Sequence, residues 1–321
     1  MAPAPVADTV GCDIGGSNIK LIVLRKGRLS RRQSFPSPAD AGKRAFLDTL
    51  TELLRPLPES PLGIALPGFL DGKLRRIVHL SNLPQLDGLR LAARLEGRLK
   101  RRVFLEADSN AGAMGEARLG AGRKIERLLY LTMGTGLGAA LTIKGFPARV
   151  SNNTVGQVGG LPICSEKGRG AEDLLCAAGI LHRFQAQAKQ PAVSSTLELL
   201  ELAQAGNAAA RASWRRTGEL LAELLGLLVP LLRPGGVIIG GGVAGASEFF
   251  LPAAREALQR RLKGRGVECP SILESALGAY SGAAGAALTI KGFPARVSNN
   301  TVGQVGGLPI CSEKGRGAED L

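Results

Sequence analysis

Two stretches of this chain share one pattern: an apolar strand, a glycine-containing turn and a second apolar strand. The first covers residues 9–24 around DIGGS at 13–17, and the second covers residues 128–143 around GTGLG at 134–138. Apolar runs of this length on either side of a glycine turn predict β-hairpins. Because the pattern returns in the second half, we expect an internally duplicated fold of two lobes that hold a ligand between them.

The length of 321 residues is sufficient for two domains with cores of their own. The stretch GAGRK at 120–124 is typical of a hinge. We therefore expect an N-terminal lobe over 1–119, a C-terminal lobe over 120–275 and a helix over 276–288 that returns to the N-terminal lobe.

Two helices are predicted from their ends and spacing. Ser37 followed by Pro38 predicts the start of a helix that runs to Leu54. Apolar residues at helical spacing predict another helix over about 172–187.

Residues 138–174 recur without a single change at 285–321. Both contexts contain GAAL, which is a plausible point of crossover in the gene or in sequence assembly. The second copy begins inside an apolar segment that has the pattern of a C-terminal helix. We predict that 289–321 is an appended tail without a site of its own. The alternative is a swap in which the tail replaces the first copy in a neighbouring molecule.

The chain is basic, with a net charge of +14. Its Lys and Arg residues form short clusters without interleaved aromatic residues, a pattern typical of solvated helix faces. A positive field can also steer an anionic substrate such as a nucleotide or polyphosphate. The sequence contains no motif that reads bases, so nucleic acid is not expected as a partner.

The cysteines are five in number and scattered, and no CxxC pair indicates a zinc site. The most apolar stretch, 220–232, is interrupted by Glu223 and Pro230 and is too short to cross a bilayer. The first residues lack the pattern of a signal peptide. These features predict a cytoplasmic protein with free thiols and no membrane contact.

Three glycine turns are candidate phosphate sites, because successive backbone N–H groups in such turns bind anions. The candidate residues are Asp13, Gly15, Gly16 and Ser17 in the first turn, Gly134, Thr135 and Gly136 in the second, and Gly240, Gly241 and Gly242 in the third. A carboxylate such as Asp13 repels phosphate unless Mg²⁺ lies between them. An ordinary tight hairpin is the alternative explanation for each turn, and a Walker A motif is absent.

The third turn also satisfies GxGxxG through Gly240, Gly242 and Gly245, with Glu268 near the end of a further strand. This arrangement keeps a dinucleotide-binding fold open as an alternative. A lone GxGxxG is weak, however, and little unique sequence remains after Glu268 to complete such a sheet.

The order of the motifs resembles the ROK family (repressors, open reading frames and kinases) of sugar kinases, which has the two-lobed, actin-like (ribonuclease H-like) α/β ATPase fold with an interlobe cleft. The resemblance covers most of residues 9–288 and rests on DIGGSNIKLIVL at 13–24, LPGFLDG at 66–72, SNLPQLDG at 81–88, EADSNAGAMGEARLGAG at 106–122, LTMGTGLGAAL at 131–141, GQVGGLP at 156–162, VIIGGGVAG at 237–245 and SALGAYSGAAGAA at 275–287.

The resemblance implies transfer of the ATP γ-phosphate to a sugar hydroxyl, with Asp108 as the general base. The first turn would meet the β- and γ-phosphates together with Mg²⁺, the second would donate N–H groups from the opposite lobe, and the third would lie under the adenosine. The residues expected at the sugar are Asn82, Asp108, Gln157, Glu172 and Asp173, with the choice between Glu172 and Asp173 left open by an ambiguous register. A homodimer is expected.

The sugar side departs from the family pattern. Ala107 precedes Asp108 where an Asn is usual, and Gln157 and Gly160 replace the Glu and His of the usual Glu-x-x-His. The cysteine-rich zinc motif keeps only Cys164. Two hypotheses follow: a glucokinase-like enzyme for a hexose or hexose derivative, or a catalytically weak or inactive protein that binds nucleotide and sugar. A polyphosphate-dependent glucokinase is a further alternative. A DNA-binding repressor is not expected, because only a few residues precede the first strand.

Overall fold

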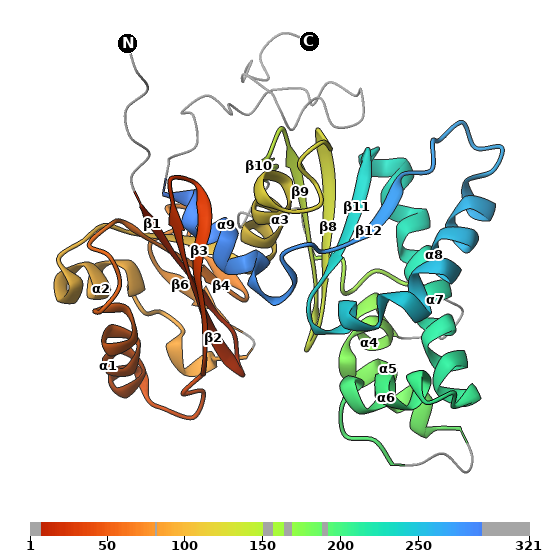
Figure 1. Ribbon diagram of the computed structural model, residues 1–321, viewed down its shortest axis with the longest axis horizontal. Coiled ribbons are helices and arrows are strands. Elements are labelled where there is room, and N and C mark those ends of the chain that lie inside the picture. The colour runs from red at the N-terminus through yellow and green to blue at the C-terminus, as the bar shows by residue number, and fades with distance from the viewer. Residues whose placement is uncertain (1–7, 81, 150–156, 164–168, 188–191, 291–321) are drawn as a thin grey trace, which may run out of the picture.

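The computed structural model describes residues 8–80, 82–149, 157–163, 169–187 and 192–290. These residues form two five-stranded sheets with helices on both sides of each (Figure 1). The first sheet has the order β3-β2-β1-β4-β7, with β1 at Thr9–Ile14, β2 at Asn18–Arg25, β3 at Arg28–Pro36, β4 at Leu62–Leu66 and β7 at Val103–Ala107. The second has the order β10-β9-β8-β11-β12, with β8 at Arg127–Met133, β9 at Leu137–Ile143, β10 at Phe146–Pro147, β11 at Gly236–Gly240 and β12 at Ser271–Glu274.

The two sheets repeat one topology. In each, the first two strands form an antiparallel hairpin, and the first, fourth and fifth strands run parallel to one another. Each hairpin is one of the two glycine-turned patterns of the sequence, so the predicted duplication is confirmed. A small antiparallel pair, β5 at Phe69–Leu70 and β6 at Ile77–His79, stands beside the first sheet.

The outer face of each sheet is covered by helices whose apolar side chains are buried in the core. On the first sheet these are α1 at Lys43–Leu54 and α2 at Leu91–Leu99. On the second sheet they are α4 at Ala171–Leu175, α5 at Ala177–Gln185, α6 at Thr196–Gln204, α7 at Ala208–Leu232 and α8 at Ser247–Leu262. Trp214 of α7 stacks on Phe250 of α8 at the centre of this second core, with ring centroids 6.2 Å apart.

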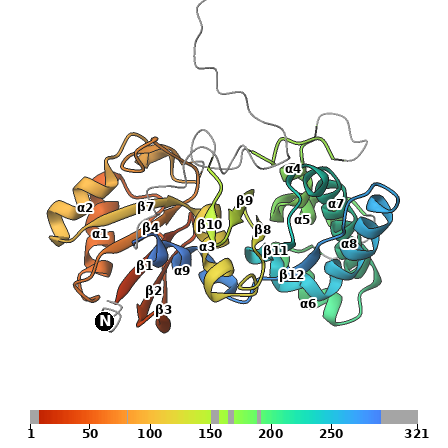
Figure 2. The same cartoon turned by 90° about the horizontal axis from the view of Figure 1, so that it is seen from above.

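The two remaining helices are exchanged between the lobes. Helix α3 (Asp108–Leu119) follows β7 of the first sheet but packs against β8 and β9, whereas α9 (Ser281–Thr289) follows β12 and packs against β1 and β4. Figures 1 and 2 both show α3 and α9 between the two sheets. The helices approach closely because glycines face their partners: a Cβ at Gly285 would lie 1.6 Å from the carbonyl oxygen of Ala111.

Three helix predictions differ from the structure in detail. The helix predicted over 276–288 begins only at Ser281, after a short 3₁₀ turn. The first helix begins at Lys43 and not at Ser37, because the backbone N–H of Ser37 donates to the carbonyl oxygen of Ser17 (2.9 Å) and holds the preceding segment on the DIGGS turn. The helix predicted over 172–187 is broken at Cys176, whose backbone is extended (ψ 164°). The Cys176 sulfur then accepts a hydrogen bond from the N–H of Gly179 and caps α5.

The predicted tail of 289–321 lies outside the described residues from 291 onward. Within the described part, α9 ends at Thr289. No helix of that part combines the length and the apolar character that crossing a membrane requires.

Candidate active site

Asp13 and Asp108 lie at the carboxyl edge of the first sheet. Asp13 is near the end of β1, and Asp108 is the first residue of α3, directly after β7. Strands β1, β4 and β7 are parallel, so their carboxyl ends meet at one edge, where ligands of open α/β sheets bind. Both side chains are half-buried. The first turn of α3 contributes one short contact, a hydrogen bond of 2.6 Å from the N–H of Ser109 to Asp108 Oδ1.

Both carboxyl groups have raised pKa values, and the charge of Asp13 contributes to that of Asp108. Burial, together with the charge of Asp13, raises the pKa of Asp108 to about 7. Burial raises the pKa of Asp13 to about 6, against the lowering effect of the Lys20 ammonium group. A carboxyl group that changes its protonation state near neutral pH is suited to accept a proton during catalysis.

The DIGGS turn is closed by its own backbone and lies against a predicted sugar residue. The N–H of Gly15 donates to the carbonyl oxygen of Asn18 at 2.9 Å. A Cβ at Gly16 would lie 3.0 Å from the Cβ of Asn82, so Asn82 borders the turn. Ser17 is exposed. Lys20 faces Asp13 as its cross-strand partner in β2, and sequence reasoning overlooked this nearby positive charge.

The GTGLG turn is hydrogen-bonded to α4 and to the start of α5. The N–H of Gly134 donates to the carbonyl oxygen of Gly136 at 3.0 Å, and the N–H of Leu137 donates to Glu172 Oε2 at 2.8 Å. The N–H of Ala177 donates to the carbonyl oxygen of Gly134 at 2.8 Å. The carboxylate at the second turn therefore belongs to Glu172 of helix α4, whereas the carboxylate at the first turn belongs to Asp13 of strand β1.

The GGG turn lies beside the GTGLG turn. A Cβ at Gly134 would be 3.8 Å from the backbone nitrogen of Gly242. Gly241 has a φ of 84°, which favours glycine, and Gly242 is exposed. Gly240 is buried, and a Cβ there would lie 2.2 Å from the Tyr130 hydroxyl oxygen, so its lack of a side chain is explained by packing.

The structure separates the two acidic residues that the sequence left ambiguous. Glu172 points to the GTGLG turn, and a Cβ at Gly136 would lie 2.9 Å from its Oε2. Asp173 accepts a hydrogen bond of 2.8 Å from the N–H of Gly170 and so caps α4. Gln157 is exposed, two residues before Gly159, whose carbonyl oxygen accepts from the N–H of Glu172.

Sequence reasoning missed the ion pair of Glu106 and Arg149. Glu106 is the penultimate residue of β7 and has no exposed surface. Its Oε1 accepts from Arg149 at 3.0 Å, from Asn110 Nδ2 at 3.1 Å and from the N–H of Ala107 at 3.1 Å. A second contact joins the Arg149 guanidinium to Glu106 Oε2. The pair ties the strand that leads into Asp108 to the segment after β10. The available signal was an acidic residue inside an otherwise apolar strand.

Oxygen ligands suitable for Mg²⁺ are present at the first turn. Among the residues that the structure describes, no three His, Cys, Asp or Glu side chains form a metal cluster. Mg²⁺ typically binds through one or two carboxylates together with phosphates and water, so a partly exposed Asp13 beside a phosphate-binding turn fits this ion.

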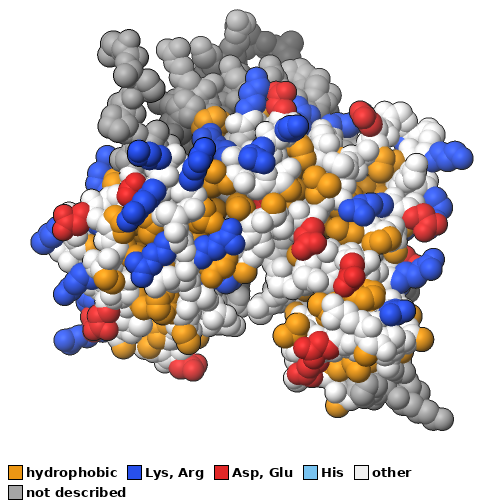
Figure 3. Space-filling model, viewed as in Figure 1, with side chains coloured by type: hydrophobic (Ala, Val, Ile, Leu, Met, Phe, Trp, Pro, Cys, Tyr) orange, Lys and Arg blue, Asp and Glu red, His pale blue; other side chains and the backbone are white. Residues whose placement is uncertain are grey.

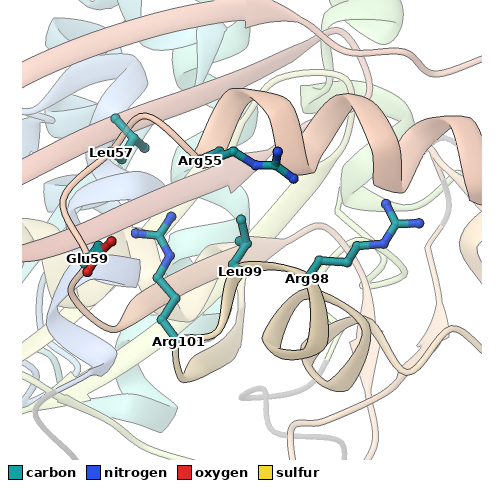
Figure 4. A pocket seen from close by; sticks show the side chains of 6 residues that line it. All are labelled: Arg55, Leu57, Glu59, Arg98, Leu99 and Arg101. Atoms are coloured by element: carbon teal, nitrogen blue, oxygen red, sulfur yellow. The ribbon is translucent and has the colours of Figure 1, made fainter.

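The surface shows a notch between the two lobes at the lower edge of the view (Figure 3). A separate cavity lies on the first lobe, lined by Arg55, Leu57, Glu59, Arg98, Leu99 and Arg101 (Figure 4). The Arg101 guanidinium donates to the carbonyl oxygen of Leu54 at 2.7 Å, and Arg98 pairs with Asp48 at 2.7 Å. These arginines hold the end of α1 and the surface of α2 in place.

Known proteins resemble the chain over nearly its whole described length. The model of the ROK family matches residues 9–292. Glucokinase of Thermotoga maritima is 25% identical over 89% of this chain and 98% of its own length. N-acetyl-D-glucosamine kinase of Shigella flexneri serotype 5b is 31% identical over 73% of this chain and 84% of its own length.

The fold agrees with these relatives. The ROK family glucokinase of Streptomyces griseus, solved in complex with glucose and AMPPNP, superimposes with a TM-score of 0.77 at 24% identity, covering 88% of this chain and 98% of that one. The resemblance predicted from the motifs is confirmed, and the dinucleotide-binding alternative is wrong. The chain belongs to the ROK family and is a sugar kinase with the actin-like ATPase fold.

Proposed function

We propose that the chain transfers the γ-phosphoryl group of ATP to a hydroxyl of a hexose or hexose derivative, with Asp108 as the general base. The observation that carries this proposal is the pairing of Asp108, whose pKa is raised to about 7, with Asp13 at the edge bounded by the glycine turns. In this mechanism Asp108 accepts the proton of the sugar hydroxyl as its oxygen attacks phosphorus.

Backbone donors would bind the phosphates from both lobes. The N–H groups of Gly15 and Gly134 are engaged within their own turns. Gly16, Ser17, Thr135 and Gly136 are therefore the donors assigned to the phosphates, and Asp13 would hold Mg²⁺. When bound, the ion neutralises charge on the phosphates during transfer.

The third turn is assigned to the adenosine through Gly241 and Gly242, which have solvent-accessible backbone beside the second turn. Gly240 supports this turn indirectly, by making room for Tyr130.

Asn82, Gln157 and Glu172 are the residues assigned to the sugar, because they border the glycine turns or the loop against them. Asp173 is assigned to capping α4. Ala107 and Gly160 have no side chain that could form a hydrogen bond with the sugar. Fewer polar side chains therefore surround the sugar than in the family pattern. Since each unmade bond to a hydroxyl costs about 1–3 kcal/mol, the favoured acceptor is a derivative that does not need these contacts. A homodimer in the cytoplasm remains a prediction from the sequence.

The test is ADP formation with Mg²⁺-ATP over a panel of hexoses, N-acetylhexosamines and mannose-type sugars. Asp108→Asn should lower kcat by about 10²–10⁴-fold, the usual contribution of a general base. Asp48→Asn, which changes a carboxylate on the surface of α1, should leave turnover unchanged. An equal loss in both variants would overturn the role of Asp108.

The pH profile provides a second check on the base. Asp108 must be ionised, and its pKa of about 7 predicts that kcat/KM rises as the pH increases through neutrality. Mg²⁺ bound to Asp13 should shift the midpoint of this rise in kcat/KM to lower pH. Turnover with polyphosphate and not ATP would select the other donor, and absence of turnover with every acceptor would favour the non-catalytic alternative.

A further inference from the structure

Glu116 is a buried carboxylate that the phosphoryl-transfer mechanism does not use. It lies in the last turn of α3 and has no exposed surface. Its Oε1 accepts from the hydroxyls of Ser275 (2.5 Å) and Ser281 (2.8 Å) and from the N–H of Leu277 (3.0 Å). Its Oε2 accepts from the N–H groups of Ala121 (3.0 Å) and Ala276 (3.2 Å). Five donors thus surround one side chain.

Four of these donors lie where the chain crosses from the second sheet to α9 on the first, and the fifth lies just after α3. Ala121 lies in the segment that joins α3 to β8, residues 275–280 join β12 to α9, and Ser281 is the first residue of α9. Gly120 leaves room for the carboxylate, since a Cβ there would lie 2.0 Å from Glu116 Oε2. One side chain of α3, a helix that packs on the second sheet, therefore holds the crossing that leads to α9 on the first sheet.

The network continues into the second sheet and toward the site. The Ser281 hydroxyl is hydrogen-bonded to Tyr130 of β8. The Tyr130 ring lies between Gly112 of α3 and Gly240 of β11, where a Cβ at either glycine would come within 2.6 Å of its atoms. The residue after Ser281 is Gly282, and a Cβ there would lie 2.6 Å from Asp13 Oδ2. The contacts of Glu116 thus reach the surroundings of Asp13 through the start of α9.

We infer that Glu116 is a positioning residue that fixes the angle between the lobes, and so the distance at which Asp108 meets the phosphates; this role rests on the proposed function. A buried carboxylate is costly to desolvate, and an apolar side chain in its place would leave the five donors without an acceptor. The carboxylate also fixes geometry, because all five donors point correctly in only a narrow range of positions of α3 relative to the crossing from β12 to α9. Sugar-driven closure then brings the reacting groups together and excludes water.

The inference is tested with Ser275→Ala, which removes one donor to Glu116, and with Glu116→Gln, which places an N–H₂ group among donors. The matched control is Thr51→Val, which removes a buried hydroxyl that donates to the Leu47 carbonyl oxygen at 2.6 Å within α1. Three quantities are measured for each: sugar phosphorylation, ATP hydrolysis without sugar, and the radius of gyration by X-ray scattering with and without ligands.

For a positioning role, Ser275→Ala should lower kcat for sugar phosphorylation by about tenfold, the scale of effects in coupling networks, with ATP affinity unchanged. The ratio of ATP hydrolysis to sugar phosphorylation should rise, because water is less completely excluded. Glu116→Gln should change both quantities further in the same direction, and Thr51→Val should change neither, even where it lowers the melting temperature equally.

A purely structural role predicts that Ser275→Ala and Thr51→Val behave alike in all three measurements, and this result would overturn the inference. Scattering does not depend on turnover: unchanged radii of gyration in Ser275→Ala and Glu116→Gln contradict the inference even if the wild type phosphorylates no sugar tested. Failure of the wild type in every donor and acceptor combination, in contrast, counts against the proposed function.

Discussion

Residues 138–142 and 285–289 have the same sequence, GAALT, yet the first lies in strand β9 and the second in helix α9. In β9 the segment leaves the GTGLG turn and pairs with β8 along its whole length. In α9 it continues a helix that begins at Ser281 and packs on the first sheet. Intrinsic preferences differ by less than about 1 kcal/mol per residue, so the surrounding partners decide which structure forms.

The two copies also use their side chains differently. Leu141 is only 1% exposed in the core of the second lobe, whereas Leu288 lies partly exposed at the edge of a smaller cluster. Gly285 faces the backbone of α3 directly, whereas Gly138 faces the side chains of Thr132 and Ser109. Paired substitutions in the two copies therefore measure how much of each effect comes from position alone.

Gly285→Ala should give the largest effect. The new Cβ would lie 1.6 Å from the Ala111 carbonyl oxygen, whereas at Gly138 it would lie 2.7 Å from a Thr132 methyl group that can move. We expect Gly285→Ala to lower the free energy of unfolding by more than about 4 kcal/mol, although Ala favours a helix, and Gly138→Ala to lower it by about 1–2 kcal/mol. Urea unfolding measures both. Equal losses would mean that the contact between α3 and α9 is looser than described.

Leu141→Ala should cost about 3 kcal/mol, because it opens a cavity in the second core. Leu288→Ala should cost about 1 kcal/mol, since the side chain is partly exposed in α9. The check is the difference in unfolding free energy between the two variants. A larger loss for Leu288→Ala would contradict the burial described for the two copies.

Thr289→Val should destabilise by about 1 kcal/mol, because the Thr289 hydroxyl donates to the carbonyl oxygen of Gly285 at 3.2 Å. Thr142→Val should be neutral or stabilising, since the Thr142 hydroxyl is buried and has no hydrogen-bond partner among the described residues. Thermal unfolding at one pH compares the two. A melting temperature lowered equally by both substitutions would contradict this assignment of partners.

A chain that stops after Ile290 should show the smallest effect. Helix α9 ends at Thr289, and the first copy already supplies the residues assigned to the site. Melting temperature and kcat for sugar phosphorylation should therefore equal those of the full chain. A loss of either property would show that the second copy contributes to folding or catalysis.

Much of the fold could be predicted because its strands carry their own signals. Both hairpins are marked by apolar runs and glycine turns, and β4 and β11 are short apolar runs of the kind that buried strands have. The start of α1 could not be predicted, because the N–H of Ser37 finds its acceptor at Ser17 on a different element. The break at Cys176 was missed for a similar reason, since the N–H of Ala177 there bonds to the GTGLG turn.

The site was predictable to the extent that its residues follow a motif. Asp13, Asp108 and the glycine turns are recognisable in the amino-acid sequence. In the fold Asp13 lies close enough to Asp108 to affect its pKa, and the second and third turns lie side by side. Glu116 and Tyr130 carry no such signal, because their function depends on partners more than 100 residues away, as for Glu116 and Ser281 (165 residues apart). Which of Glu172 and Asp173 faces the GTGLG turn also required the structure, since both lie in the first turn of α4.

The exchange of α3 and α9 affects how this protein is made. The face of the first sheet that carries Gly11 and Gly63 is covered by α9, which is among the last described segments to leave the ribosome. At a translation rate of about 5–20 residues per second, that face stays uncovered for on the order of tens of seconds before α9 is synthesised. During synthesis the N-terminal half is therefore an incompletely folded intermediate with an exposed sheet face, and we expect chaperones to bind the nascent chain there.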